Sequence, residues 1–407
     1  MNSATAAGRL SITLRERVPQ LCPLGADDVA FLTAEHRDHL ALLPTDQAGR
    51  YRLTPTGHVG TIVCPCTRLI IRPKIPIEDL YHLLDPATPV AYMEDDVSPE
   101  PGTEAFNFLA ARFAQLLGEC IRAGLHRGYV ERHQSGAFLQ GRLDVAAQVR
   151  TGTSRKDRLH CTYEEFTADV PYNQVLKATA LLLLHSPLLH DRVAAQVHQL
   201  LPALEGITTV PLLADRFCEL LPTRLTAAYR QLLELCRLLF DGLAAGKESG
   251  AVVCPAFLLD MERVFERYVS EGVREAFGNH PRYSVAMQPL HSVAPPKPAQ
   301  PDLQIRPDML VSLDGQPVAV LDAKWKKLST GALRPADVYQ VLAYAAILGV
   351  SRAILVYPGR RNRRWQYPFD RTGSRLEVYT LRVTGSPRAC QRSLRDLGNT
   401  LRSSVMN

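Results

Sequence analysis

Two apolar runs on either side of a short turn predict a β-hairpin in the last third of this 407-residue chain. The runs are Leu303–Val311 and Pro317–Trp325, and Asp314-Gly315 stands between them. An Asp-Gly pair favours the tight turns that join antiparallel strands. The region is therefore expected to fold around a hairpin and not around a helix.

The hairpin brings charged side chains together. If it is centred on Gly315, residues whose numbers add up to 630 lie opposite each other, so Asp308 faces Asp322 with Cβ atoms roughly 5 Å apart. Because side chains alternate along a strand, Lys324 points to the same face as Asp322. The sequence therefore predicts two carboxylates and an ammonium group in one small site.

Facing carboxylates repel each other unless positive charge lies between them. Mg²⁺ prefers one or two carboxylates together with waters and phosphate oxygens, so Asp308 and Asp322 could hold it against a phosphodiester. Lys324 could orient the attacking water, help to deprotonate it, or neutralise charge that develops on the phosphorus centre. This pattern predicts metal-dependent phosphodiester hydrolysis.

A surface ion pair is the plain alternative, because Asp and Lys on an exposed strand face commonly form one. Asp322, however, directly follows the apolar run Val318–Leu321. Strands with such continuous apolar runs are usually buried on both faces. The position of Asp322 thus favours the end of a buried strand.

The chain is long enough for two or three folding units. Alternating apolar and polar runs predict a β-rich domain at 1–84, and four prolines with several acidic residues predict a linker at 85–104. Residues 105–250 are expected to be mostly helical, and 251–407 are expected to form an α/β domain. The predicted fold class is mixed α/β.

The expected elements rest on hydrophobic periodicity. In the middle region, apolar residues recur at helical spacing over 103–127, 172–200 and 214–245. In the last region the order is helix, strand, hairpin, helix and strand, at 258–277, 283–288, 303–325, 335–348 and 353–357.

Composition limits the compartment and the partners. No run approaches the roughly 18 apolar residues of a membrane span. Nine scattered cysteines do not form a disulfide framework, so a reducing cytoplasm is expected. The net charge of +6 is modest, but 39 of the 47 basic residues are Arg and three of the eight Lys cluster at 324–327. Lys is the basic residue whose pKa shifts readily on burial.

These motifs carry a family resemblance. Pro307-Asp308 and Asp322-Ala-Lys324, with a preceding helical Glu and Gln340-x-x-x-Tyr344 after them, resemble the PD-(D/E)xK nuclease superfamily in its RecB-like form. More narrowly, the chain resembles the McrC family, the nuclease subunits of 5-methylcytosine-specific restriction systems. The segments that carry this resemblance are Leu321-Asp-Ala-Lys-Trp-Lys326, Phe265-Glu-Arg-Tyr-Val269, Ile71-Arg-Pro-Lys-Ile75, and Tyr163-Glu-Glu-Phe-Thr followed by Asn173.

The resemblance implies roles for individual residues. Glu266, Asp308 and Asp322 would bind Mg²⁺, Lys324 would be the catalytic lysine, and Gln340 would support the site from the adjacent helix. Periodicity leaves the helical ligand open, because Glu266 lies at the edge of the apolar stripe and Glu262 lies one turn away. Either glutamate could instead form a helical ion pair, for example with Arg263.

The chain is not expected to hydrolyse a nucleotide itself. Gly242–Ser249 comes nearest to a phosphate-binding loop, but its spacing is short and Glu248 stands where Ser or Thr belongs. The resemblance implies an AAA+ GTPase partner, McrB, which would recognise modified double-stranded DNA while this chain docks, stimulates GTP hydrolysis and cuts. The docking apparatus would be the first two regions.

Twelve Arg and no Lys follow from Arg352 to the C-terminus, most densely at Gly359–Trp365. This Arg-rich tail is either a phosphate-contacting surface or a solvated loop. The leading hypothesis for the whole chain is a metal-dependent endonuclease subunit. A non-catalytic DNA-binding adaptor that activates the GTPase, and a RecB-like nuclease of another defence or repair system, are the alternatives.

Overall fold

The computed structural model describes residues 9–84, 102–150, 158–212, 217, 220, 229–243, 247–249, 252–278, 280–293, 303–328, 333–369 and 374–406. By its internal contacts the chain divides into two compact units. The first contains residues 1–98, 249–254 and 258–407, and the second contains residues 99–248 and 255–257. The predicted linker at 85–104 lies outside the described residues up to residue 101.

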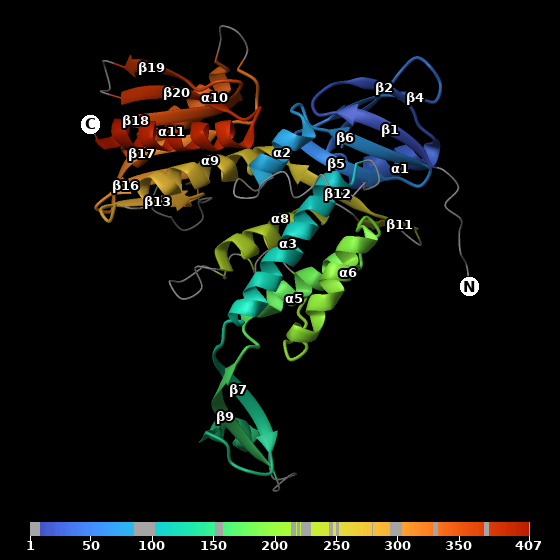
Figure 1. Ribbon diagram of the computed structural model, residues 1–407, viewed down its shortest axis with the longest axis vertical. Helices are drawn as coiled ribbons and strands as arrows, with labels where there is room; N and C mark the ends of the chain where they lie inside the picture. Colours follow the sequence, from blue (N-terminus) through green and yellow to red (C-terminus); the bar gives the residue numbers. More distant parts are fainter. Residues whose placement is uncertain are drawn as a thin grey trace. The chain divides into compact units, whose positions relative to one another are not determined.

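Short strands and two helices form the N-terminal part of the first unit (Figure 1). They are β1 (Leu10–Arg15), β2 (Gln20–Pro23), α1 (Ala26–Glu35), β3 (Leu40–Pro44), β4 (Arg50–Pro55), β5 (His58–Val63), β6 (Thr67–Arg72) and α2 (Ile77–Leu84). One sheet has the order β1-β6-β5-β12, where β12 is Ala256–Asp260, and a second has the order β2-β4-β3. The expected β-rich region is confirmed.

A six-stranded mixed sheet forms the C-terminal part of the same unit, in the order β13-β16-β17-β18-β20-β19. Strands β17, β18 and β20 are parallel, and the remaining neighbours are antiparallel. The elements are α9 (Met261–Phe277), β13 (Tyr283–Met287), β14 (His291–Ser292), β15 (Gln304–Ile305), β16 (Met309–Leu313), β17 (Gln316–Ala323), α10 (Pro335–Leu348), β18 (Arg352–Gly359), β19 (Arg363–Phe369), β20 (Ser374–Arg382) and α11 (Pro387–Met406). The predicted mixed α/β class is confirmed.

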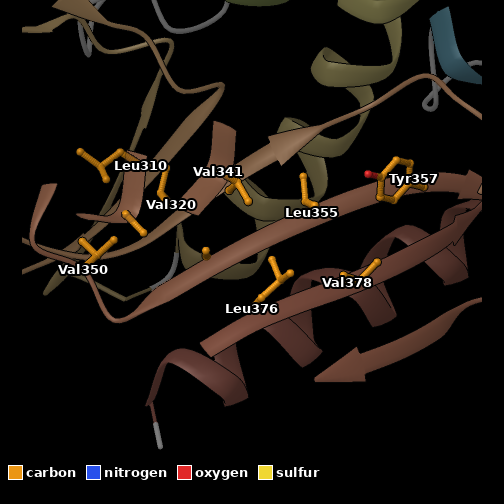
Figure 2. Close-up of a cluster of buried hydrophobic side chains, with 10 residues drawn as sticks. Leu310, Val320, Val341, Val350, Leu355, Tyr357, Leu376 and Val378 are labelled. Carbon is orange, nitrogen blue, oxygen red and sulfur yellow. The ribbon is translucent and has the colours of Figure 1, made fainter. Parts of the chain in front are cut away.

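The C-terminal sheet is held by a core of aliphatic side chains (Figure 2). Leu355 and Tyr357 of β18 belong to it, and Val341 and Ala345 of α10 pack against the strands. Because β18 is buried along nearly its whole length, its run of apolar residues matches a central parallel strand. Full burial of side chains of this size contributes roughly 1.5–3 kcal/mol each.

Local sequence explains why the elements begin and end where they do. Asp314 and Gly315 adopt φ of 48° and 82°, which is the conformation of a tight hairpin turn and suits Gly at its second position. Helix α10 begins with Pro335 in its first turn and ends at Gly349, which has a left-handed φ of 66°. The predicted hairpin and the predicted helix at 335–348 are both confirmed.

Two predictions about this part need correction. The helix expected at 258–277 begins at Met261, because residues 256–260 form β12 and the Asp260 carboxylate caps the helix by accepting from the N–H of Glu262 at 2.9 Å. The arginine-rich segment is not a tail. From residue 352 onward it forms β18, β19, β20 and α11, which complete the sheet and cover it.

Helices dominate the second unit, as expected, and four of them pack together. They are α3 (Glu104–Ala123), α5 (Pro171–Leu184), α6 (Asp191–Leu200) and α8 (Arg230–Leu243), with a short 3-10 helix at Leu201–Leu204. The single helix predicted over 172–200 is divided at residues 185–190, where Pro187 cannot continue it. Much of the predicted stretch 214–229 lies outside the described residues.

A three-stranded sheet in this unit was not predicted. Its strands are β7 (Gly128–Gly136), β8 (Arg142–Leu143) and β9 (Leu159–Thr167), in the order β7-β9-β8. The short helix α4 (Val145–Arg150) lies between β8 and β9 in the sequence. Figure 1 shows β7 and β9 extending away from the helices of the unit. The strands are largely polar on both faces, so they lack the alternation that identifies a half-buried strand.

Buried polar residues join this sheet to the helices. The Asn173 side chain is fully buried and donates to the carbonyls of His126 and Ala168 at 2.9 and 2.7 Å, and it accepts from the Tyr229 hydroxyl at 2.9 Å. Asp169 accepts from Arg132 on β7 at 3.0 Å and from the Thr208 hydroxyl at 2.6 Å. Each buried polar atom in this group has a partner, as stable interiors require.

Replacing Asp169 with Asn is expected to destabilise the second unit by about 1–3 kcal/mol at neutral pH. Burial raises the pKa of Asp169, but hydrogen bonds from Thr208, Gln174 and Arg132 outweigh burial and hold the pKa well below its ordinary value. A carboxylate of this kind stabilises the fold above its unfolded pKa of about 3.9, and the gain is lost as the pH falls below that value. The difference in melting temperature between wild type and Asp169→Asn should therefore narrow below about pH 4. A difference that stays constant with pH would contradict this account.

Within the described residues, no helix is long and apolar enough to cross a membrane.

Candidate active site

The β16–β17 hairpin has the predicted register where the acidic residues lie. Met309 pairs with Leu321 and Val311 pairs with Ala319, so the residue numbers add up to 630 as expected. Nearer the turn the register shifts by one at a β-bulge between Val311 and Ser312. The turn is centred between Asp314 and Gly315, and the bulge restores the alignment that sets Asp308 against Asp322.

Asp308, Asp322 and Lys324 lie together at one end of the hairpin. The Asp308 carboxylate accepts from the backbone N–H of Ala323 on the facing strand at 2.7 Å. Asp322 is 1% exposed, and its Oδ2 forms an ion pair with Lys324 Nζ at 2.6 Å. The expectation that Asp322 ends a buried strand is confirmed. Because Asp322 is buried and Lys324 is partly buried, their ion pair is not an exposed surface pair.

Glu266 on α9 reaches the same site, and Glu262 does not. Glu266 interacts electrostatically with Asp322 and accepts from the Gln288 side-chain amide at 2.8 Å. Glu262 is exposed and forms an ion pair with Arg17 at 2.5 Å. The choice that periodicity left open therefore falls on Glu266 as the helical carboxylate of this cluster.

Gln288 connects two of the acidic residues. Its side chain holds Glu266, and its backbone N–H donates to the carbonyl oxygen of Asp308 at 2.8 Å. Gln288 also has a left-handed φ of 42°, which is uncommon for a residue other than Gly. Such backbone strain persists where surrounding contacts fix it, and here both contacts position the acidic cluster.

Burial and mutual repulsion raise the pKa of each carboxyl in the cluster. Burial, followed by the charges of Asp322 and Glu266, raises the pKa of Asp308 to about 8. Burial also raises the pKa of Glu266, and in Asp322 it outweighs the opposing effect of Lys324. Without a cation the cluster therefore favours protonated carboxyl groups, and a bound positive charge would favour their ionised forms.

A divalent cation would supply the positive charge that lets these neighbouring carboxyl groups ionise together. Each carboxylate has one close donor, from Gln288, Ala323 or Lys324, which leaves further oxygens available to a ligand. In the described residues, no three His, Cys, Asp or Glu side chains form a ready-made metal cage. Mg²⁺ does not need one, because it usually keeps several waters and takes one or two carboxylates. The residues present fit that ion.

Lys324 is held as a positive charge. Burial alone lowers the pKa of Lys324, but the ion pair with Asp322 and the nearby Asp308 and Asp337 outweigh burial, so the pKa is raised. Of the roles left open for Lys324, a fixed charge that stabilises negative charge on a phosphate agrees with this environment better than proton abstraction does.

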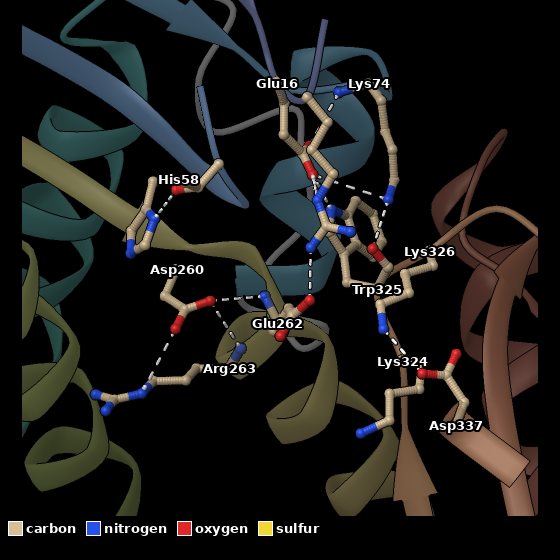
Figure 3. Close-up of polar contacts among 12 residues, drawn as sticks. Glu16, His58, Lys74, Asp260, Glu262, Arg263, Lys324, Trp325, Lys326 and Asp337 are labelled. Atoms are coloured by element: carbon tan, nitrogen blue, oxygen red, sulfur yellow. Dashed lines mark hydrogen bonds and ion pairs between the residues drawn. The ribbon is translucent and has the colours of Figure 1, made fainter. Parts of the chain in front are cut away.

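Trp325 anchors the next position in the chain (Figure 3). It is fully buried, and its indole N–H donates to Glu16 on β1 at 2.9 Å. Lys74 donates to the Trp325 carbonyl at 2.8 Å and lies 4.1 Å from the centre of its ring. Lys74 and Trp325 are 251 residues apart, so the motifs Ile71–Ile75 and Leu321–Lys326 meet in one structural contact.

Lys326 is fixed from the other side. Its ammonium group pairs with Asp337 on α10 at 2.9 Å, and Asp337 also accepts from the Tyr357 hydroxyl at 3.1 Å. Lys324 therefore lies between Asp322 and two anchored residues. This arrangement restricts the segment and with it the position of the ammonium group.

Gln340 lies on α10 and is exposed. Its side-chain amide donates to the Tyr344 hydroxyl at 2.9 Å, because residues one helical turn apart share a face. The contact is exposed to solvent. Support of the acidic cluster by Gln340 stays a prediction.

The arginine-rich segment divides between the two faces of β19. Arg364 pairs with the buried Glu377 at 2.9 Å, so it has a structural role. Trp365 is partly buried and packs against the hydrophobic core. Arg360, Arg361 and Arg363 are exposed.

Sequence reasoning missed Glu16, Gln288 and Asp337. Gln288 stands after a strand and Asp337 in the first turn of a helix, and neither position has a pattern that marks a functional site. Glu16 lies between two Arg residues at the end of β1, where a charged residue is normally solvated. Their roles arise from contacts between distant segments, which periodicity does not encode.

The fold and the acidic cluster define an α/β protein with a carboxylate–lysine site at the carboxyl end of a sheet strand. The chain belongs to the family described as "McrBC 5-methylcytosine restriction system component", which matches residues 53–358.

Individual relatives are distant. The chain is 21% identical over 183 residues to "Type IV methyl-directed restriction enzyme EcoKMcrBC" of Escherichia coli (strain K12), a match that covers 44% of this chain and 52% of that relative. The chain thus spans about half the length of the curated relative it matches. A "Refined half-complex from tetradecameric assembly of Thermococcus gammatolerans McrB AAA+ hexamers with bound McrC" matches with a TM-score of 0.48 and 20% identity, covering 96% of this chain and all of that one. A cryo-EM structure of the Thermococcus gammatolerans McrBC complex matches with a TM-score of 0.42 and 21% identity, covering 67% of this chain and 89% of that one.

Proposed function

We propose that this chain is a metal-dependent DNA endonuclease subunit of a modification-dependent restriction complex. The observation that carries the proposal is the convergence of Glu266, Asp308 and Asp322 with Lys324 at the end of a buried strand. Family membership supports the restriction context. A structural role alone does not explain one buried and two partly buried carboxyl groups beside one ammonium group, because their ionised forms repel one another unless a cation binds.

The residues divide the work of phosphodiester hydrolysis. One or two carboxylates of the cluster Glu266, Asp308 and Asp322 would hold Mg²⁺ together with waters, and the ion would supply positive charge and lower the pKa of a water. Lys324 keeps a proton on Nζ and stabilises the negative charge that grows on the phosphate. Gln288 fixes Glu266 relative to Asp308, and the anchored Trp325 holds the segment that carries Lys324.

The proposal includes partners. The nearest approach to a phosphate-binding loop, at Gly242–Ser249, lacks the required spacing and hydroxyl residue. A restriction component of this kind therefore requires a separate nucleotide hydrolase, for which an AAA+ GTPase of the McrB type is the expected partner. The proposed substrate is methylated double-stranded DNA. The expected location is the cytoplasm.

The test is cleavage of methylated plasmid DNA with the AAA+ partner, GTP and a series of Mg²⁺ concentrations. Glu266→Gln should raise the Mg²⁺ concentration needed for half-maximal cleavage by about tenfold or more, in the range found when support around a metal site is removed. Glu262→Gln is the matched control, because Glu262 is one turn away and pairs with Arg17. The control should behave as the unaltered chain does.

Two results would contradict the proposal. Cleavage that persists in the presence of a chelator would show that the activity does not depend on a metal ion. If the unaltered chain never cuts but still stimulates GTP hydrolysis by the partner, the nuclease role would be replaced by that of a non-catalytic adaptor.

A further inference from the structure

A basic groove lies in the first unit, beside the acidic cluster. It has a volume of about 900 Å³ and is formed where three parts of the unit meet: the segment after β6, the segment after Lys324, and the β18–β19 turn with the end of β20. Its basic lining residues are Lys74, Lys327, Arg360, Arg361 and Arg363. None of the described residues that line it is acidic.

Most of this charge is not used within the unit. Lys74 is committed to the Trp325 carbonyl and to Glu16. By contrast, Lys327, Arg360, Arg361 and Arg363 are exposed, and among the described residues no carboxylate forms an ion pair with them. Four neighbouring unpaired cations repel each other, so their grouping on one wall indicates an anionic ligand.

The strand geometry turns these side chains to the same face. Side chains alternate along β19, and Arg363 and Trp365 line the groove while Arg364 pairs with Glu377. Trp365 and Leu328 give the groove an apolar floor. A wall of Arg and Lys over such a floor suits a sugar-phosphate chain, whose phosphates are charged and whose sugars are less polar.

The groove and the acidic cluster lie at the same edge of the sheet. The Lys324 N–H donates to the Val356 carbonyl at 2.9 Å, so β17 and β18 end at the same edge of the sheet. Lys327 follows Lys324 by three positions, and Pro358 and Gly359 complete β18 at the groove. Ligands of open α/β sheets bind beyond the carboxyl ends of parallel strands, which is where both features lie.

We propose that this groove binds the phosphate backbone of the DNA strand that passes through the acidic cluster. The proposal rests on the proposed nuclease function and adds a second subsite to it. The contacts are to phosphates, so the groove positions the strand without reading its sequence.

The test compares two triple variants that lose the same charge. The first is Lys327→Ala/Arg360→Ala/Arg363→Ala in the groove. The second is Arg388→Ala/Arg392→Ala/Arg395→Ala on α11, whose arginines are exposed and do not line the groove. Binding of a labelled DNA duplex to the full chain is measured by fluorescence anisotropy over a range of salt concentrations, without Mg²⁺ so that no cutting occurs.

The groove variant should bind at least about tenfold more weakly, and its slope of log affinity against log salt should fall by about one for each lost phosphate contact. The α11 variant should keep the slope of the unaltered chain. Equal loss in both variants, or an unchanged slope in the groove variant, would overturn the proposal, as would failure of the unaltered chain to bind DNA at low salt.

Two further readouts distinguish DNA binding by the groove from protein binding, and from failure of the proposed nuclease function. If the groove variant binds DNA normally but no longer stimulates GTP hydrolysis by the partner, the groove binds an acidic protein surface and the DNA proposal is wrong. If the groove variant loses DNA binding while the unaltered chain shows no metal-dependent cleavage, the groove stands and the nuclease function fails.

Discussion

Replacing Lys324 with Met is expected to lower DNA cleavage by about 10²–10³-fold, the loss typical of removing one group that stabilises developing charge. Met keeps much of the length of the side chain but removes the charge that lies 2.6 Å from Asp322 Oδ2. Because the raised pKa of Lys324 keeps it protonated at neutral pH, the loss reflects missing positive charge and not a missing base. The measurement is the single-turnover rate with saturating Mg²⁺, GTP and AAA+ partner.

Stimulation of GTP hydrolysis by the partner is the internal control for this variant. It should remain within about twofold of the unaltered chain, because the Lys324 ammonium group pairs with Asp322 and not with the regions proposed to dock the partner. A thermal melt on the same sample shows whether loss of the ammonium group has destabilised the first unit. Cleavage by Lys324→Met at the unaltered rate would remove Lys324 from the proposed mechanism.

The hairpin could be predicted from the sequence because its determinants are local. Asp314-Gly315 specifies the turn, and the apolar runs on either side specify the strands. The assumed centre at Gly315 was displaced by half a residue from the true turn, and a bulge at Val311–Ser312 compensates for the difference. The facing of Asp308 and Asp322 was therefore predicted, although the bulge that produces it was not.

The helical carboxylate could not be chosen from the sequence. Glu262 and Glu266 are one turn apart, and the apolar stripe of α9 permits either to face the site. Two tertiary contacts distinguish them. Arg17, which follows β1, forms an ion pair with Glu262, and the side-chain amide of Gln288 donates to Glu266. Partners at such sequence separation follow from the packing of the whole unit.

The polar sheet of the second unit was missed for a different reason. Strands β7 and β9 have no apolar face, so neither alternation nor a buried run marks them. Their pairing is fixed by a continuous nine-residue register and by the contacts of Asp169 with Arg132 and Thr208. Hydrophobic patterns in a sequence indicate which residues are buried. Because this sheet is stabilised mainly by polar contacts, its strands show no such pattern.

The second large effect is expected from Trp325→Ala, which should lower the free energy of unfolding of the first unit by about 3–5 kcal/mol. Trp325 is fully buried against Phe265, with the ring centres 5.5 Å apart. Its removal leaves a cavity and takes away the donor to Glu16, which is itself 2% exposed. Cleavage should fall as well, because Lys324 loses its anchored neighbour.

Two variants separate the contributions of volume and hydrogen bonding. Trp325→Phe fills most of the space but leaves Glu16 without the indole donor, so we expect a loss of about 1–3 kcal/mol. Trp365→Ala removes the chain's other tryptophan, which is only partly buried, and should cost less than Trp325→Ala. Urea unfolding followed by circular dichroism and calorimetry gives the three values. A Trp325→Ala variant as stable as Trp365→Ala would show that the contact between β1, the Lys74 segment and the Lys324 segment does not hold the site together.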